Sequence, residues 1–312
     1  MARLEVTPIK VPNPFFERDN NAYLLDAGHL VLIDTGIDTA DAFSALEDGI
    51  VGSGHKIEEI GKILLTHKHL DHFGMAHVLA KISGAEVYIH QDDLIDVTQF
   101  DARHDLIDSL YEVKMREWGI PQNLIDMLSM RSRLVKLGRS VPAIPLKDNQ
   151  VLNIGGQQLK VIHTPGHTQG SSCFLIDEVL FTGDHLLPTY TPNVGATEVT
   201  AHGMLRKYRA SLLKIKEYSG RRALPGHGQE MEDANRRIEE IMVHHDEREA
   251  RILEILKDRG PRSVYQIAQE LFGTLKEHHV LLGAGEVHAH LESLLSEKQV
   301  SSSENLWYVR YP

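Results

Sequence analysis

A turn of seven residues, placed directly after a short apolar run, carries three histidines and one aspartate. The run is Ile63-Leu64-Leu65, and the turn reads Thr66-His67-Lys68-His69-Leu70-Asp71-His72. His67 and His69 are two residues apart, so on extended backbone their side chains point the same way. Zinc and similar cations bind imidazole nitrogen and carboxylate oxygen. The pattern predicts a metal-binding turn at the end of a buried strand, with a histidine-rich surface loop as the alternative.

The segments on either side of this turn alternate between strand and helix signals. Two apolar runs, at residues 21–28 and 29–36, meet at Ala27-Gly28 and predict a hairpin. The second run is apolar almost throughout and ends in Asp34-Thr35-Gly36, which puts a carboxylate at a strand tip. Helical spacing at residues 39–46 and 75–82 alternates with strand signals at 57–65 and 86–90. This order predicts a sheet covered by helices.

Residues 92–140 depart from this alternation and show helical spacing on both sides of Ile120-Pro121. We interpret them as a helical hairpin inserted between two strands. The segment is rich in large, adaptable apolar side chains: Met115, Trp118, Met127 and Met130. It either packs onto the main body or forms a lid that lines an apolar pocket above the metal site.

Three further polar residues follow strand signals in the second half of the chain. His167 and His227 each end a Pro-Gly-His sequence, and Asp184 follows Gly183 after an apolar run. Glycine before such a residue permits backbone that other residues resist. A buried histidine alone is more often a hydrogen-bonded core residue, so the prediction rests on the order of the whole set.

That order resembles the metallo-β-lactamase superfamily. The pattern is Asp-Thr-Gly, then Thr-His-x-His-x-Asp-His, Pro-Gly-His-Thr, Gly-Asp and Gly-His, and every position is present here. The resemblance covers residues 1 to about 245 and looks closest to the glyoxalase II-like and β-lactamase-like branch. It implies an α/β fold of the αββα sandwich type, with two divalent metal ions at one edge of the paired sheets.

The resemblance also implies roles for individual residues. A first ion would have three histidine ligands: His67, His69 and His167. A second ion would have one aspartate and two histidine ligands: Asp71, His72 and His227. Asp184 would bridge the two ions, and Asp34 would orient a ligand histidine through its other ring nitrogen. Zinc is expected, with iron and manganese as alternatives that accept the same ligands.

Such a pair of ions implies hydrolysis. Two divalent cations lower the pKa of a shared water from about 15.7 to about 7, so hydroxide forms at neutral pH and attacks a carbonyl or phosphoryl centre. We predict a hydrolase that cleaves an ester, thioester or lactone with an apolar portion. The alternatives are a metal-dependent phosphodiesterase or endoribonuclease, and a non-catalytic sensor that binds a metabolite at the metal site.

The loop after Asp184 adds two candidates to the predicted catalytic set of Asp71 and Asp184. Tyr190 would donate a hydrogen bond to the substrate carbonyl oxygen, and His185 would protonate the leaving group. The alternative is that both side chains only pack the loop.

Residues 246–312 form a separate predicted domain. Helical spacing at 238–257, 264–272 and 286–296, followed by a strand pair, resembles a winged helix. This region has eight lysines and arginines against eleven aspartates and glutamates, a net charge of −3. A helix that reads a DNA groove needs basic or amide side chains, so we expect this domain to close the pocket or form a homodimer contact.

Composition narrows the partners further. The chain of 312 residues has a net charge of −11 and a single cysteine, Cys173. Nucleic acid and anionic membrane are therefore poor partners, and a small-molecule substrate is expected. The first residues lack the apolar stretch of a signal peptide, which favours a cytoplasmic location. Scattered basic residues would contact an anionic thioester or merely face solvent: Arg131, Arg133, Lys136, Arg139, Arg206, Lys207 and Arg209.

Overall fold

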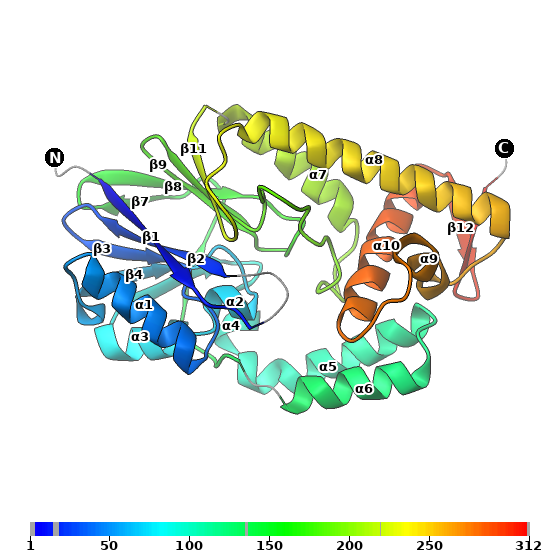
Figure 1. Cartoon of the computed structure of the whole chain (residues 1–312), viewed down its shortest axis with the longest axis horizontal. Helices are drawn as coiled ribbons and strands as arrows, with labels where there is room; N and C mark the ends of the chain where they lie inside the picture. Colours follow the sequence, from blue (N-terminus) through cyan, green and yellow to red (C-terminus); the bar gives the residue numbers. More distant parts are fainter. Residues whose placement is uncertain (1–3, 15–18, 135–136, 219, 311–312) are drawn as a thin grey trace.

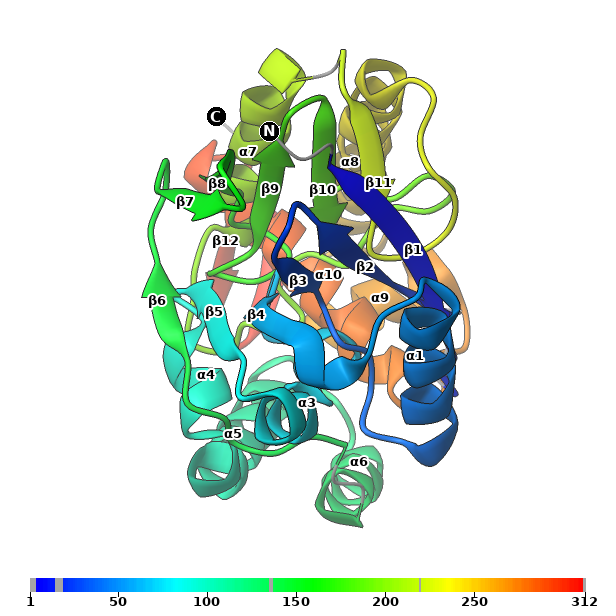
Figure 2. The same ribbon diagram turned by 90° about the vertical axis from the view of Figure 1, so that its left-hand side faces the viewer.

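Two β-sheets stack face to face, and helices cover their outer surfaces (Figure 2). The computed structural model describes residues 4–14, 19–134, 137–218 and 220–310, without the side chains of 131–134. The first sheet has the order β1-β2-β3-β4-β5-β6. Its strands are β1 (Glu5–Val11), β2 (Asn20–Asp26), β3 (Leu30–Ile33), β4 (Ile60–Leu64), β5 (Glu86–His90) and β6 (Ile144–Leu146). This αββα sandwich confirms the predicted fold class.

The second sheet has the order β11-β10-β9-β8-β7. Its strands are β7 (Val151–Ile154), β8 (Gln157–His163), β9 (Ser172–Ile176), β10 (Val179–Gly183) and β11 (Arg222–Pro225). Strands β10 and β11 are parallel, as are β3, β4, β5 and β6. Because parallel strands end at the same edge of a sheet, the residues that follow them gather there.

Three apolar layers hold the sandwich together. Side chains such as Leu25 and Phe174 fill the space between the sheets. The outer face of the first sheet packs on α1 (Ala40–Gly52) and α3 (Ala76–Ser83), and that of the second on α7 (Met204–Ile215) and α8 (Ala234–Arg259). Helix α3 ends at Gly84, whose φ of 74° suits glycine. Short helical turns complete this part: η1 (Ile57–Glu59), α2 (Leu70–Phe73) and η2 (Lys216–Tyr218).

The predicted helical insertion lies between β5 and β6. It consists of α4 (Leu94–Thr98), α5 (Phe100–Glu117) and α6 (Gln122–Leu134). The C-terminal elements are α9 (Val264–Phe272), α10 (His279–Ser296), β12 (Val300–Ser303) and β13 (Leu306–Val309). Met115, Trp118 and Ile125 of the insertion share one apolar cluster with these C-terminal elements, and Figure 1 shows the two parts side by side.

The C-terminal part contains the predicted helices and differs in where the last of them begins. Helix α8 runs unbroken from Ala234 to Arg259, so residue 245 lies inside a helix, and the division into two domains there stays a prediction. Helix α10 begins seven residues earlier than predicted and includes two glycines. A Cβ at Gly285 would lie 2.4 Å from Ala196 Cα, so this glycine lets the loop that contains Ala196 pack closely against α10. The likeness to a winged helix stays a prediction. Among the described residues, no helix is long and apolar enough to cross a bilayer.

Candidate metal centre

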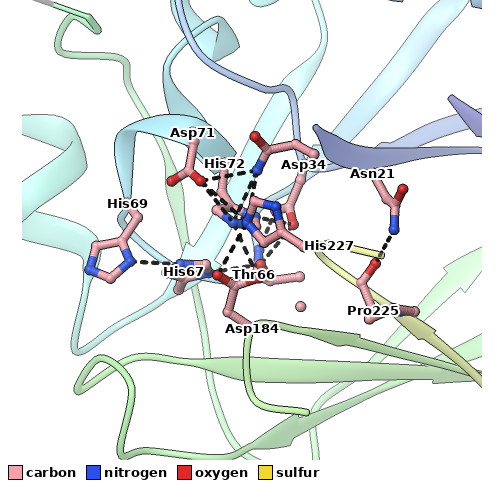
Figure 3. A network of polar contacts seen from close by, with 12 residues as sticks. Asn21, Asp34, Thr66, His67, His69, Asp71, His72, Asp184, Pro225 and His227 are labelled. Atoms are coloured by element: carbon pink, nitrogen blue, oxygen red, sulfur yellow. Dashed lines mark hydrogen bonds and ion pairs between the residues drawn. The ribbon is translucent and has the colours of Figure 1, made fainter. Parts of the chain in front are cut away.

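The polar residues singled out in the sequence meet at one edge of the sandwich (Figure 3). Asp34 follows β3, and the histidine turn follows the neighbouring strand β4. From the second sheet, His167 follows β8, Asp184 follows β10 and His227 follows β11. The two sheets thus present their strand ends to each other across this edge.

The seven predicted ligand side chains form three overlapping groups. The groups are His67/His69/His167, His67/His72/Asp184 and Asp71/His72/His227, and within each the ligand atoms lie within 4.8 Å of one another. Asp184 Oδ2 lies 3.7 Å from His167 Nε2 and 3.4 Å from His227 Nε2. Asp184 therefore lies between His167 of the first predicted ligand set and His227 of the second, where a bridging carboxylate would have to lie.

The far ring nitrogens of four of the histidines face an oxygen that accepts a hydrogen bond. His67 faces Thr66 Oγ1 at 3.0 Å, whose own proton goes to Asp34, and His72 faces Asp34 Oδ2 at 2.9 Å. His167 faces the Asn193 carbonyl at 2.7 Å, and His227 faces the Asp19 carbonyl at 3.2 Å. His69 Nε2 lies 2.9 Å from the Thr197 hydroxyl, which can donate or accept. A nitrogen that faces an acceptor carries the proton, so the other nitrogen offers its lone pair to the centre. Asp34 takes the position that the resemblance implied for it.

This arrangement fits a cation. His67 Nε2 and His69 Nδ1 lie 3.0 Å apart, so the two rings point at one position. His167 Nε2 is buried and has no hydrogen-bond partner among the described residues. An unpaired buried nitrogen beside two such rings is unfavourable unless a positive charge lies there.

The pKa values of the histidines in this site also indicate that the site favours a positive charge. Burial, followed by the neighbouring His72, lowers the pKa of His67 well below its usual value. Burial opposes a charge on His72 as well, but carboxylates around it, Asp184 first, raise its pKa well above the usual value. For His227, burial is likewise outweighed by Asp184 and Asp71, which raise its pKa to about 10. The negative potential of these carboxylates is suited to a divalent cation.

The comparisons with known proteins agree with this geometry. The profile described as the metallo-beta-lactamase superfamily matches residues 16–227. The chain belongs to this superfamily. Over 316 residues it is 26% identical to the probable metallo-hydrolase YqjP of Bacillus subtilis (strain 168), covering 97% of this chain and 96% of that protein.

Two further similarities add detail. A metallo-beta-lactamase family protein from Thermus thermophilus superposes with a TM-score of 0.83 at 29% identity, over 98% of both chains. The atrochrysone carboxyl ACP thioesterase dmxR1 of Cryptosporiopsis sp. (strain 8999) is 28% identical over 173 residues, covering 53% of this chain and 50% of that protein. With its histidine and aspartate clusters, the chain is a metal-binding hydrolase of the metallo-beta-lactamase superfamily.

The two Pro-Gly-His sequences of this superfamily member need glycine because of close contacts. A Cβ at Gly226 would lie 2.2 Å from Asp184 Oδ1, inside the metal centre. A Cβ at Gly166 would lie 2.4 Å from Tyr208 Cβ, and Gly166 also has a φ of 150°. At position 166, both the lack of space and the positive φ require glycine. Gly226 does not have a positive φ, so only the lack of space requires glycine there.

A cavity of about 530 Å³ opens beside the metal centre. His69, Asp71, His167 and Asp184 line part of it. The rest of the wall comes from the inserted helices, the start of α10 and the loop of residues 193–200. Its surface is mostly apolar, with Ile107, Leu128, Leu281 and Leu282, although Asp96, Arg103 and Glu198 also line it. Met115 also lines the cavity, whereas Met127 and Met130 are exposed and lie outside it. The insertion thus does line an apolar pocket.

His185 and Tyr190 are not among the residues that line this cavity. His185 is 1% exposed, and its ring packs edge-on against Tyr208 at 5.1 Å. Burial lowers the pKa of His185 to about 3, so it holds no proton to donate at neutral pH. Tyr190 is half-buried in the same loop. The contact with Tyr208 shows that His185 packs the loop, and the catalytic roles of His185 and Tyr190 stay predictions.

Of the basic residues named from the sequence, those whose side chains the structure describes do not line the cavity: Arg139, Arg206, Lys207 and Arg209. Arg209 pairs with Asp246 and Glu249, at 2.5 and 2.8 Å. Arg206 is exposed on α7. Lys136 lies outside the described residues, as do the side chains of Arg131 and Arg133.

Asn20 is a member of the site that sequence reasoning missed. Its Nδ2 lies 3.2 Å from Asp71 Oδ2, 3.4 Å from His72 Nε2 and 3.3 Å from His227 Nε2. These are the three ligand atoms of the second set, so the amide points at the position where they converge. An asparagine at the start of a strand carries no sequence signal for this role. Asn20 reaches the site because β2 lies beside the residues that follow β11, where Asn20 forms a β-bridge with His227.

Asn20→Asp is expected to raise the affinity of the Asp71, His72 and His227 set for a divalent ion by about tenfold or more. The added carboxylate would lie beside Asp71, where it is repelled in the metal-free protein and attracted by a divalent cation. A competitive titration against a chromophoric chelator measures this affinity, with Asn20→Ala as the neutral control. Equal affinities of Asn20→Asp and the wild type would exclude a contact between residue 20 and that ion.

Proposed function

We propose that this protein is a binuclear, zinc-dependent hydrolase that cleaves a carboxylic ester, thioester or lactone with an apolar acyl part. One observation supports the proposal: Asp184 lies between His167 and His227, and the histidine and aspartate groups around it line a cavity with a mostly apolar surface. The partial similarity to a protein named as a thioesterase supports the acyl substrate class.

The proposed ligands follow the two sets. His67, His69 and His167 would hold the first ion; Asp71, His72 and His227 would hold the second; Asp184 would contact both. Iron or manganese would accept the same ligands. Two such ions, when bound, lower the pKa of a water from about 15.7 to about 7 and polarise the bond under attack.

The protein's own groups would hold this arrangement still. Asp34 accepts hydrogen bonds from the Thr66 backbone N–H and hydroxyl, at 2.8 and 2.7 Å, and from His72 Nδ1 at 2.9 Å. It therefore ties the histidine turn of β4 to the end of β3 and fixes the ring of His72. A ligand ring that cannot rotate loses little entropy when it binds an ion, which strengthens binding.

The cavity wall favours a carbonyl substrate over a phosphodiester. Lys68 and Arg103 are the lysine and arginine among the described lining residues. Lys68 Nζ lies 2.9 Å from Asp96 Oδ2 and 2.9 Å from Glu198 Oε1, and Arg103 Nε lies 3.3 Å from Asp96 Oδ1. Since both cations are neutralised by the protein, little positive potential remains for a nucleic-acid backbone.

The C-terminal helices would shape this cavity and would not read DNA. Most of α10 is buried, including Glu286, which accepts from the Val194 backbone N–H at 3.0 Å and pairs with Arg248 at 3.3 Å. A helix so enclosed has no free face for a groove. A homodimer contact stays a prediction.

Elemental analysis and a substrate panel test this proposal. Purified protein is expected to contain two zinc ions per chain and to hydrolyse acyl thioesters, esters or lactones. Exhaustive chelation should abolish that activity, and added zinc should restore it. Cleavage of a phosphodiester alone would favour the phosphodiesterase alternative, metabolite binding without turnover would favour a sensor, and full activity after chelation would end the proposal.

A further inference from the structure

One face of α5 lines the cavity along most of the helix. The lining positions follow a single helical stripe: Phe100, Arg103, His104, Ile107, Asp108, Tyr111 and Met115. At about 1.5 Å per residue, the stretch from Phe100 to Met115 spans about 22 Å. The cavity is therefore long as well as apolar, and an extended ligand fits it better than a compact one.

The polar groups on this stripe bind partners within the protein. Arg103 Nε lies 3.3 Å from Asp96 Oδ1, His104 Nδ1 lies 3.4 Å from Asp108 Oδ2, and the Tyr111 hydroxyl donates to the Thr197 carbonyl at 3.0 Å. The polar groups of the stripe thus face neighbours within the protein, and the surface that remains for a ligand is mainly apolar.

The two ends of this stripe, and so of the cavity along it, differ in chemistry. At the start of α5, Phe100 packs edge-on against Phe73 of α2, the turn that carries Asp71 and His72, with ring centroids 5.4 Å apart. At the far end, Met115, which is 2% exposed, belongs to the apolar cluster shared by the insertion and the C-terminal helices. Leu128 of α6 and Leu281 of α10 also line the cavity and pack against that cluster, where Figure 1 shows the α5–α6 hairpin beside α10.

We propose that this cavity binds a linear aliphatic acyl chain and that Met115, Leu128 and Leu281 set the longest chain it accepts. The proposal rests on the hydrolase function above and names its substrate class as linear acyl thioesters. In the reaction, a bond forms between the water oxygen and the carbonyl carbon, the carbon–sulfur bond breaks, and the thiolate takes a proton from that water. The carbonyl lies at the metal end, and the chain runs along α5.

Chain length then governs the rate. Each methylene transferred from water to an apolar wall contributes about fourfold to binding, and hence to kcat/KM where chemistry limits the rate. The increase continues with each added carbon until the chain reaches the far end. Beyond that point, a longer chain clashes with the wall or leaves its end in water, so kcat/KM levels off or falls.

A panel of linear acyl-coenzyme A thioesters, from butanoyl to hexadecanoyl, tests this with the full-length zinc-loaded protein. Wild-type kcat/KM is expected to rise with length to a plateau. Leu128→Trp fills the far end and is expected to lower kcat/KM for the longest substrates by about tenfold or more, leaving the butanoyl value within about twofold. Leu281→Trp is a second variant at the same end, should Leu128→Trp fold poorly. Leu106→Trp is the matched control, because Leu106 lies on α5 outside the cavity lining and is 53% exposed.

Binding to the metal-free protein separates this inference from the proposed function. Displacement of the fluorescent fatty acid cis-parinaric acid by free fatty acids is expected to strengthen with chain length in the wild type and to weaken in Leu128→Trp. Length-dependent binding without thioester hydrolysis would overturn the function and keep the acyl site. Hydrolysis with the same kcat/KM at every length, or plateaus unchanged in both tryptophan variants, would overturn the acyl site.

Discussion

Asp184→Asn is expected to lower kcat/KM by at least about a hundredfold and to reduce the zinc content of the purified protein. Asp184 is buried, and its two oxygens lie within 3.7 Å of His72, His167 and His227. Asparagine keeps the shape of the side chain but removes the negative charge that two divalent ions would share. Burial would raise the pKa of this carboxyl, but His227 and His72 hold it well below its usual value, so the charge is present at neutral pH.

Asp177→Asn is the matched control for this experiment. Asp177 lies exposed in the turn between β9 and β10, with a φ of 54° that asparagine also tolerates. Elemental analysis and kinetics on the same preparations give both readouts, and circular dichroism checks the fold. An Asp184→Asn protein that keeps two zinc ions and wild-type kcat/KM would remove Asp184 from the metal centre.

Lys68→Met is expected to lower the free energy of unfolding by about 3–5 kcal/mol. The Lys68 side chain is 13% exposed, and its ammonium pairs with both Asp96 and Glu198. The backbone N–H of Lys68 donates to Asp93 Oδ2 at 3.1 Å. Without the ammonium, the negative charges of Asp96, Glu198 and Asp93 would remain in a largely buried site with little nearby positive charge to offset them. Urea denaturation of the metal-free proteins measures the loss.

The pH dependence of this contribution follows from the Lys68 pKa. Burial alone would lower it, but Glu198, Asp93 and Asp96 raise it above the ordinary value. The stabilisation is therefore fully present below the unfolded pKa of about 10.4 and is lost only as the pH rises through the higher folded pKa. The difference between wild type and Lys68→Met should thus stay constant across the neutral range.

Lys62→Met is the control, because Lys62 carries a similar ion pair at the surface. Its ammonium lies 2.6 Å from Glu86 Oε2, with side-chain exposures of 31% and 54%. An exposed pair of this kind contributes about 1 kcal/mol or less. Adding Glu198→Gln to Lys68→Met should restore part of the lost stability by removing one uncompensated carboxylate. Equal losses for Lys62→Met and Lys68→Met would contradict this account.

The histidine turn and the fold class could be predicted from local pattern. His67, His69, Asp71 and His72 lie within six residues of one another, and the apolar run before them ends the strand that presents them. Local pattern also predicted the order of strands and helices, and it predicted the helical insertion between two strands. Each depends on hydrophobic period and on breakers such as Ile120-Pro121, which act over a few residues.

Other parts of the site had no local signal. Asn20 reaches the second ligand set through the position of its strand, and the Thr197 and Asn193 oxygens hold His69 and His167 from a loop far along the chain. His185 shows the reverse case. It directly follows Asp184 in sequence, but its side chain points into the core against Tyr208.

The sequence by itself determined the ligand types, their order and the strands that carry them, because these depend on residue chemistry and short-range spacing. Only the tertiary structure decided how the two sheets bring His167, Asp184 and His227 to the histidine turn. It also decided that the insertion and the C-terminal helices enclose one long apolar cavity. Contacts between segments a hundred residues apart come from the packing of whole layers, for which sequence spacing provides no rule.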